Sequence, residues 1–416
     1  MLDKVIRAGM LAAAVLLTAT ACGGRGEGAD TLGSGDCRGQ QVTGITDTTI
    51  KLGGVYPLSG PASAYGEMPK GVRAYFDYVN AERGGVAGRQ VEYLVRDDGY
   101  QPPKTVEETR RLVEQDRVFA LFQTLGTPTS SAVWDYVGQQ EVPHVFVAGG
   151  ATKWGADTDH PWTIGWQPSY RAEGRAFAEY VRTHRPGATV AVLYQNDDFG
   201  KDLLDSFRES VRDSDIRIVA EQSYAVTDPT VDPQLRNLAT SKADVLLNFS
   251  TPKFASQALA ADARDPGWNP LHIVSMVANS RTVLEPVGFA NVQGVVSAAF
   301  SKDPADPQWN DDPGMRLYKE KLAAYAPDAD PADQYTSVGW AAAESFHKAM
   351  ESATCPTREG LRDAVRNLSD VEIGLLQPGV TLRTGPGDGF PMEAMRIQRF
   401  EGDRWVLTGE LIDTAE

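Results

Sequence analysis

The alternation of short apolar segments with longer amphipathic segments constrains the fold of this chain more than any other feature. It runs once over residues 50–148 and again over residues 189–276, on either side of the polar, proline-containing segment 165–169. Near-continuous apolar strands separated by helices are typical of βαβ units, in which helices cover both faces of a parallel sheet. The sequence therefore predicts an α/β protein with two doubly wound parallel-sheet lobes. Open sheets of this kind bind ligands at the carboxyl ends of their strands.

Periodicity supports this interpretation of the amphipathic segments. Val72, Tyr75, Phe76 and Val79 fall at positions i, i+3, i+4 and i+7, so they form one apolar stripe on a helix. The pattern predicts helices at residues 68–82, 104–114, 130–139, 170–183, 200–212, 233–240 and 254–263. It predicts strands at residues 50–56, 91–96, 119–122, 144–148, 189–194, 216–221, 245–249, 272–276 and 292–298.

The last third of the chain departs from this alternation. A loop rich in proline and aspartate, residues 301–313, precedes two expected helices at residues 315–325 and 335–352. Thr357 is a suitable N-cap for a further helix at residues 361–368. The tail, residues 374–411, has the pattern of a hairpin, with turn signals at residues 383–389 and 401–403.

Composition excludes several classes of protein. A chain of 416 residues has the length of about two to three domains. Its 42% hydrophobic content excludes a disordered chain, and its net charge of −16 argues against a nucleic-acid partner. The longest apolar segment, residues 10–21, is shorter than the roughly 20 residues that a membrane-spanning helix needs. A polytopic membrane protein is therefore excluded.

The first residues have the pattern of a secretory signal. Lys4 and Arg7 precede the apolar segment, which ends in small residues directly before Cys22. We expect residues 1–21 to be a lipoprotein signal peptide and Cys22 to carry the lipid; the alternative is an ordinary signal peptide. Residues 22–47, rich at first in glycine and charge, are expected to form a flexible tether.

The cysteines agree with an oxidising compartment. Apart from Cys22, the chain contains only Cys37 and Cys355, which we expect to form a disulfide; two free buried thiols are the alternative. The five histidines are scattered and no Cys or His cluster has metal-ligand spacing, so neither a metal nor a cofactor is expected.

Several motifs resemble the type I periplasmic-binding-protein fold, specifically the branched-chain-amino-acid-binding branch of ABC importer substrate-binding proteins. The first is IKLGGVYPLSGP at residues 50–61, followed by AYGE at residues 64–67. Further matches are GGVAGR at 84–89, RDD at 96–98, LGTPTS at 125–130, VP at 142–143 and YQNDDFG at 194–200. The resemblance extends over residues 48–410 in order.

Two of these loops suit a ligand on physical grounds. Thr127 and Thr129 lie where the third strand passes into a helix, so their hydroxyls and free N–H groups could hold a carboxylate; a simple N-cap is the alternative. Gly149, Gly150 and Ala151 follow the fourth strand and could expose backbone donors beside them, or form only a tight turn.

The resemblance implies a closed site with contributions from both lobes. Tyr65 and Phe199 would pack on the ligand, Thr127 and position 151 would hold its carboxylate and ammonium, and Thr251 and position 276 would complete the site. Ala151 and Met276 depart from the family pattern, which has a hydroxyl residue and an acid there. A buried ammonium without a counter-charge is costly. We therefore expect an apolar or aromatic acid, or another carboxylate without an amino group, with Trp154 and Trp166 as further aromatic contacts.

The resemblance also implies the domain organisation and the partners. The N-terminal lobe would consist of residues 48–168 and 298–375. The C-terminal lobe would consist of residues 169–297 and 376–416. The chain would cross between the lobes near residues 166–170, 297–301 and 374–379. Such a protein closes as a hinge on its small-molecule ligand and delivers it to an ABC permease. We expect a monomer, extracytoplasmic and anchored by lipid to the outer face of the cell membrane. A ligand-sensing receptor subunit of the same fold is the alternative.

An enzyme, specifically a hydrolase, is a weaker hypothesis. The chain lacks the GxSxG, GxxxxGK[ST] and HExxH motifs. Paired acids such as Asp97 with Asp98 and Asp197 with Asp198 are more often solvated or used as helix caps. No catalytic residue is predicted.

Overall fold

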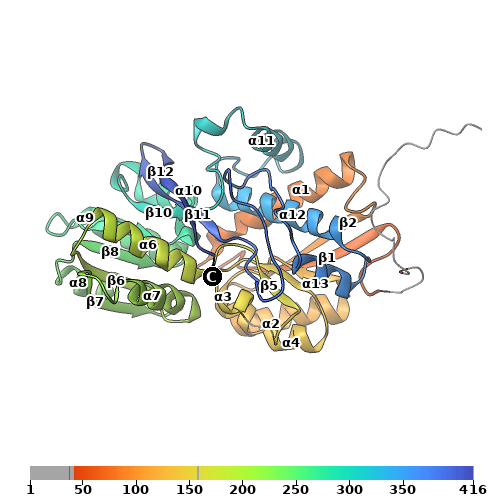
Figure 1. Ribbon diagram of the computed structural model, residues 1–416, viewed down its shortest axis with the longest axis horizontal. Coiled ribbons are helices and arrows are strands. Elements are labelled where there is room, and N and C mark those ends of the chain that lie inside the picture. Colours follow the sequence, from red (N-terminus) through yellow and green to blue (C-terminus); the bar gives the residue numbers. More distant parts are fainter. Residues whose placement is uncertain (1–36, 38–41, 157–158, 416) are drawn as a thin grey trace, which may run out of the picture.

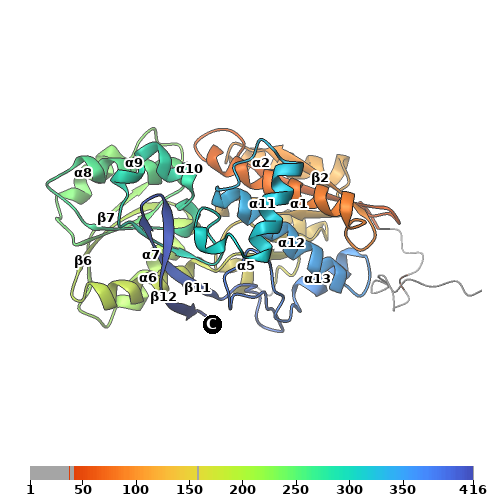
Figure 2. The same ribbon diagram turned by 90° about the horizontal axis from the view of Figure 1, so that it is seen from above.

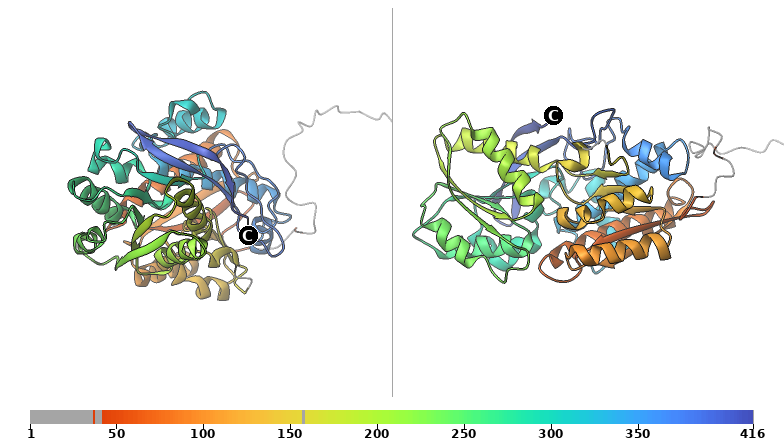
Figure 3. Two further views of the ribbon diagram at one scale, coloured as in Figure 1. Left: turned by 60° about the vertical axis from the view of Figure 1, so that its left-hand side comes forward. Right: turned by 90° about the horizontal axis from the view of Figure 1, so that it is seen from below.

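The computed structural model describes residue 37 and residues 42–156 and 159–415. Two sheets, each with its own helices, occupy opposite ends of the long axis of the molecule (Figure 1 and the right-hand view of Figure 3). Their strand orders are β2-β1-β3-β4-β5 and β12-β11-β10-β9-β8-β6-β7. The prediction of an α/β protein with two doubly wound lobes is confirmed.

The first lobe is built on a parallel sheet. Its strands are β1 (Thr49–Tyr56), β2 (Gln90–Asp97), β3 (Ala120–Phe122), β4 (His144–Val147) and β5 (Thr163–Gly165). The helices between them are α1 (Met68–Glu82), α2 (Pro102–Arg110) with its extension Arg111–Gln115, α3 (Thr127–Ser131), α4 (Trp134–Gln139) and α5 (Lys153–Ala156).

Three later helices return to this first lobe. They are α11 (Pro313–Tyr325), α12 (Gln334–Ser352) and α13 (Arg358–Val365). Both α11 and α12 pack against α1 (Figure 2). A Cβ at Gly71 of α1 would lie 1.9 Å from the carbonyl oxygen of Thr336, so only glycine allows the backbones of α1 and α12 to approach so closely. The buried stripe of α1, with Val72, Phe76 and Val79, faces this contact and the sheet, as predicted.

The second lobe combines parallel and antiparallel strands. Its parallel strands are β6 (Thr189–Gln195), β7 (Arg217–Tyr224), β8 (Val245–Phe249), β9 (Leu271–Val274) and β10 (Val296–Ala299). Its helices include α6 (Tyr170–His184), α7 (Asp198–Val211), α8 (Asp232–Ala239), α9 (Pro252–Arg264) and α10 (Arg281–Leu284). The predicted C-terminal hairpin exists: β11 (Ala394–Glu401) and β12 (Arg404–Asp413) turn at residues 402–403 and add antiparallel strands beside β10.

The chain passes from lobe to lobe at three places. The first two crossings follow β5 and β10, near the predicted positions, and their side chains meet where the rings of Trp166 and Phe300 lie 5.6 Å apart. The third was predicted near residues 374–379 and lies later. Leu382 still pairs with Val371, and Thr384 still bonds to Leu368, so residues 376–392 remain on the first lobe until β11 begins.

Some element bounds also differ from the sequence prediction. The helix expected at 130–139 is divided into α3 and α4, β5 was not expected, and the strand expected at 292–298 begins only at Val296. The hydroxyls of Thr129 and Ser131 bond to carbonyls four residues earlier, and such bonds compete with the regular helical pattern.

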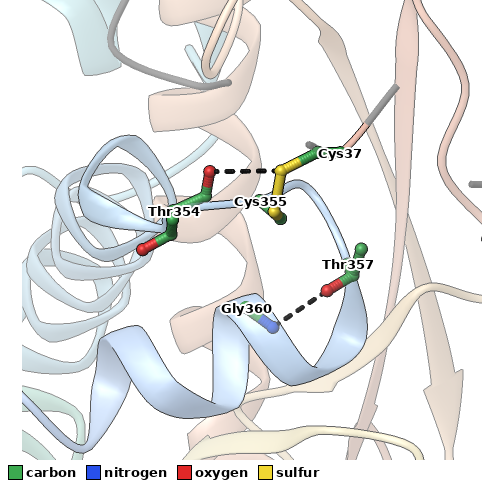
Figure 4. Close-up of a disulfide and its surroundings, with 5 residues drawn as sticks. All are labelled: Cys37, Thr354, Cys355, Thr357 and Gly360. Carbon is green, nitrogen blue, oxygen red and sulfur yellow. Dashed lines mark hydrogen bonds between the residues drawn. A yellow bond between two sulfur atoms is a disulfide. The ribbon is translucent and has the colours of Figure 1, made fainter. Parts of the chain in front are cut away.

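The predicted disulfide between Cys37 and Cys355 is confirmed (Figure 4). It joins the start of the described chain to the segment between α12 and α13, across 318 residues of sequence. The contact of 3.6 Å between Sγ of Cys37 and the carbonyl oxygen of Thr354 is no hydrogen bond, because a disulfide sulfur carries no hydrogen.

Thr357 caps α13 as predicted, accepting from the N–H of Gly360 at 3.0 Å.

The predicted signal peptide and the lipidation site Cys22 lie outside the described residues. In the part of the chain that the structure describes, no helix has both the length and the apolar character needed to cross a bilayer.

Candidate functional site

A cavity between the lobes is the candidate functional site. Its volume is about 60 Å³. The first lobe, the second lobe and the crossings all contribute to its walls. The residues that line it are Tyr65, Met68, Tyr100, Leu125, Gly126, Ala148, Gln167, Tyr170, Phe199, Thr251, Met276, Val277, Asn279, Ala298, Ala299, Phe300, Ser301, Gln334, Tyr335 and Val338.

The lining is aromatic and uncharged. Tyrosine and phenylalanine rings from both lobes form much of it, and none of its residues is Asp, Glu, Lys, Arg or His. Burial raises the pKa of Tyr65, Tyr100 and Tyr335 well above the usual value, so their hydroxyls stay neutral. The described ranges also contain no group of three or more His, Cys, Asp or Glu side chains placed to hold a metal ion. The cavity suits a ligand with an apolar body and few polar groups.

Four of the nine residues predicted for the ligand site line this cavity. They are Tyr65 from the loop after β1, Phe199 at the start of α7, Thr251 before α9, and Met276 after β9. Each follows the carboxyl end of a strand, where open α/β sheets place their ligand loops. Contact with a ligand itself stays a prediction for all nine.

The other five lie behind the lining. Thr129 donates its hydroxyl to the carbonyl of Gly126 at 3.0 Å, so this hydroxyl is already used within its own loop. Thr127 is buried with no hydrogen-bond partner for its hydroxyl, beside Gly149. Gly150 accepts from the N–H of Tyr170 at 2.6 Å, and Ala151 is buried in the apolar cluster around α6 and α7.

The two tryptophans proposed as further aromatic contacts do not line the cavity. Trp166 packs on Phe300 and donates its indole N–H to Ser345 at 3.0 Å. Trp154 packs against Trp134, with ring centroids 5.3 Å apart. Both are buried packing residues.

The loop that carries Met276 is fixed by a buried acid. Glu173 of α6 accepts from the backbone N–H of Met276 at 2.6 Å and from the hydroxyl of Ser275 at 3.2 Å. Burial raises the pKa of Glu173 to about 8, against the opposing effect of these two hydrogen bonds. Most Glu173 side chains are therefore protonated at neutral pH, and the acid contributes structure rather than charge.

Tyrosines of the first lobe reach across the cavity to the second. The hydroxyls of Tyr65 and Tyr335 both donate to the carbonyl oxygen of Val277, at 3.0 and 2.8 Å. Their rings lie edge to face with centroids 4.9 Å apart. These contacts hold the two walls of the cavity together in the conformation described.

Polar contacts join the lobes outside the cavity as well. Lys153 of α5 lies 2.7 Å from Asp198 of α7, and the N–H of Thr152 donates to Asp202 at 2.8 Å. On another side, the carboxylate of Asp333, which caps α12, accepts from Ser280 and from Thr282, the latter at 2.6 Å. These bonds join the two lobes in the arrangement described.

Sequence reasoning missed much of the lining, including Tyr100, Gln167, Tyr170, the residues after β10 and the start of α12. Tyr100 follows β2, so the rule that ligand loops follow strands could have found it. Gln334 and Tyr335 come from a helix far along the chain, and no local pattern marks them.

Comparison with known proteins identifies the family. A family model described as periplasmic binding protein matches residues 49–404. The Leu/Ile/Val-binding protein homolog 7 of Brucella suis is 26% identical over 269 residues, which cover 61% of this chain and 64% of that relative. The chain thus spans less than two thirds of that relative's length.

Solved structures share the fold. A fatty acid ABC transporter substrate-binding protein from Thermomonospora curvata is 24% identical with a TM-score of 0.79, and the match covers 90% of this chain and 95% of that one. A branched chain amino acid ABC transporter from Thermus thermophilus with bound valine is 20% identical with a TM-score of 0.78, covering 89% and 98%.

The chain belongs to the periplasmic binding protein family and has its type I fold. This assignment confirms the family resemblance found in the sequence. It also argues against the hydrolase hypothesis, because the relatives named above are binding or transport proteins by name.

Proposed function

We propose that this protein is the extracytoplasmic solute-binding component of an ABC importer, and that its ligand is an apolar or aromatic compound with a carboxylate or amide head. The observation that carries the proposal is the cavity between the lobes, with its aromatic, uncharged lining. Closure of the two lobes around such a ligand would bury it and present the closed form to the permease.

The lining argues against an α-amino acid. A buried charge of either sign needs partners. A carboxylate can take hydrogen bonds from the N–H and O–H donors of the lining, whereas an ammonium would need the family acid expected at position 276, which is a methionine here. Glu173, an acid that supports the wall of the site, has its pKa raised to about 8, so it offers little negative charge at neutral pH. The names of the relatives range from valine to fatty acid, so the fold alone does not select the ligand.

The cellular setting is also part of the proposal. A lipid on Cys22 would keep the protein at the outer face of the membrane, close to its permease, with the residues before the first lobe as a tether. Two or more acyl chains anchor stably where a single chain does not. We propose that the protein works as a monomer.

A thermal-shift panel tests the ligand class. The purified protein is melted with 3-phenylpropionate, 3-phenylpropionamide, benzoate, octanoate, leucine and valine, each at the same concentrations. A ligand that binds only the folded state stabilises it by RT ln(1 + [L]/Kd), so the Tm rises with the logarithm of the ligand's excess over Kd. We expect the acids or the amide to raise the Tm. A strong shift with leucine or valine alone would contradict the proposed ligand class.

Phe199→Ala links a positive result to this cavity. The side chain is buried in the lining, and Asp197 fixes its backbone by accepting from the N–H of Phe199 at 3.0 Å. Loss of the ring should weaken binding about tenfold or more, since buried aromatic contacts dominate such sites. Phe289→Ala is the matched control, because Phe289 belongs to the second lobe and does not line the cavity.

A further inference from the structure

Gln167 is a polar residue of the cavity lining whose amide nitrogen has no protein partner. Nε2 of Gln167 is buried and makes no hydrogen bond to any described residue. A buried donor without an acceptor costs free energy of the order of a lost hydrogen bond. Such a group at the wall of a cavity is explained when a ligand supplies the acceptor.

Several other polar side chains of the lining already donate to protein groups. Thr251 donates to Gln195 at 3.0 Å, Asn279 donates to the carbonyl of Ala298 at 3.1 Å, and Gln334 donates to Asp303 at 3.1 Å. The hydroxyls of Tyr65 and Tyr335 share the carbonyl of Val277. The hydrogen bonds of these groups stabilise the walls of the cavity, so the groups are poor candidates for recognising a ligand.

The position of Gln167 in the fold supports this role. It lies on the first crossing, between β5 and α6, directly after Trp166, which is packed against Phe300 and Ser345. Residues after β10, among them Phe300 and Ser301, line the same part of the cavity. The amide is therefore held at the hinge side of the cavity, on a backbone that both lobes share.

We propose that Gln167 determines specificity by donating its Nε2–H to an acceptor oxygen, a carboxylate or amide carbonyl, in the head group of the ligand. This inference rests on the proposed function, and it orients the ligand: the head group faces the hinge, and the apolar body faces the rings of Tyr65 and Phe199. Because Nε2 of Gln167 is a donor, a ligand that places a hydrogen-bond acceptor at this end of the cavity is favoured over one that places a donor there.

Two substitutions separate the donor from the shape of the side chain. Gln167→Met keeps a similar length without the donor, and Gln167→Glu replaces the donor by an acceptor that carries negative charge. Binding of 3-phenylpropionate and 3-phenylpropionamide is measured by isothermal titration calorimetry for the wild type and both variants. Gln140→Glu, at an exposed position of the first lobe, is the control for the charge change.

The two probes should respond differently. Gln167→Met should weaken the acid by about ten- to a hundredfold and the amide by about two- to tenfold, since hydrogen bonds to charged groups are the stronger ones. Gln167→Glu should nearly abolish binding of the acid and largely preserve binding of the amide, whose N–H groups can donate to the new carboxylate. Gln140→Glu should leave both affinities unchanged.

Each contrary result has a distinct meaning. If the wild type binds the probes and both Gln167 variants bind them equally well, the role of Gln167 is wrong and the proposed function stands. An equal loss of both probes in Gln167→Glu also overturns it, because a merely structural role predicts that result. If the wild type binds neither probe, the proposed ligand class fails and this inference fails with it.

Discussion

Glu173 shows how a buried side chain can shape a site that it does not line. Its carboxyl group holds the backbone of Met276 and the hydroxyl of Ser275, and its pKa is raised to about 8 by burial. In the unfolded chain its pKa returns to about 4.5. Between these two values the unfolded state has lost the proton and the folded state still holds it, so stability falls as the pH rises.

Glu173→Gln should remove this dependence. The amide keeps an acceptor for the N–H of Met276 and cannot ionise. We expect the difference in unfolding free energy, variant minus wild type, to increase by roughly a few kcal/mol between pH 5 and pH 8. Above pH 8 the difference should stay constant. Urea unfolding at several pH values measures the difference.

The control is Glu179→Gln, an exposed acid on the same helix. Its surface ion pair with Arg182 should make little difference at any pH. Wild-type and Glu173→Gln curves that stay parallel over the whole pH range would show that Glu173 is not protonated in the folded state.

The predictability of single site residues depended on local context. Tyr65 and Phe199, which lie in recognisable motifs, and Met276, which was placed by the family resemblance alone, all follow strands and line the cavity. Gln167 and Glu173 were not found, because neither has a neighbour in sequence that explains its role. Glu173 bonds to residues more than 100 positions away, and the unpartnered amide of Gln167 is evident only from the folded structure; neither leaves a periodic pattern in the sequence.

At the scale of elements, the short helix α5 and the start of α7 form a contact between the lobes. Nζ of Lys153 lies 5.2 Å from the ring centroid of Trp134, 5.1 Å from that of Trp154, and 2.7 Å from Asp198. The aromatic faces and the carboxylate all favour the ammonium in this position. Since α5 and α7 belong to different lobes, opening of the hinge would break the contact with Asp198.

Lys153→Met should therefore shift the protein away from the closed form. The methionine can still pack between the two indole rings, so the variant loses the charge and keeps most of the packing. We expect about two- to fivefold weaker binding of a ligand such as 3-phenylpropionate, a modest effect because the pair is partly exposed. Calorimetry measures the affinity, and tryptophan fluorescence reports the environment of Trp134 and Trp154.

Lys201→Met removes the same charge from an exposed position of α7 and is the matched control. A double-mutant cycle that combines Lys153→Met with Asp198→Asn isolates the contribution of the Lys153–Asp198 ion pair to the binding free energy. If Lys153→Met and Lys201→Met have the same affinity, the contact between α5 and α7 does not contribute to closure.

The bounds of helices with a strong apolar periodicity were predicted closely, whereas short elements without such a periodicity were missed. The helix α1 begins and ends at the predicted residues, and α6, α7, α11 and α12 begin and end within two residues of their predictions. The strand β5 has only the three residues Thr163–Gly165, too few to show a pattern. This strand forms because β4 offers a free edge for pairing. The free edge is a property of the tertiary structure, so no local sequence pattern indicates it.

At the scale of the whole molecule, the two lobes follow from the twofold alternation, and the path between them does not. The hairpin of β11 and β12 was expected from its turn signals, and its pairing with β10 completes the second sheet. The late third crossing was misplaced because residues 376–392 have no regular structure of their own. They stay on the first lobe through individual bonds, such as that from the N–H of Leu368 to the hydroxyl of Thr384.

The disulfide acts on this same scale, because it joins residues 318 positions apart within the first lobe. A cross-link over so long a segment restricts the unfolded chain far more than the folded one. Neither Cys37 nor Cys355 lines the cavity, so the bond should support stability without taking part in binding.

The double variant Cys37→Ser with Cys355→Ser tests this separation. We expect its unfolding free energy to fall by about 2–4 kcal/mol, measured by urea denaturation, with the affinity for 3-phenylpropionate unchanged. Wild-type protein treated with a reductant should approach the same midpoint, whereas reductant should not affect the variant. An unchanged midpoint would mean that contacts of residues 42–50 with the first sheet already fix the start of the chain. A weaker affinity at unchanged stability would instead connect the disulfide to the cavity, through α12, whose first turn carries Tyr335 and whose last residue is three positions before Cys355.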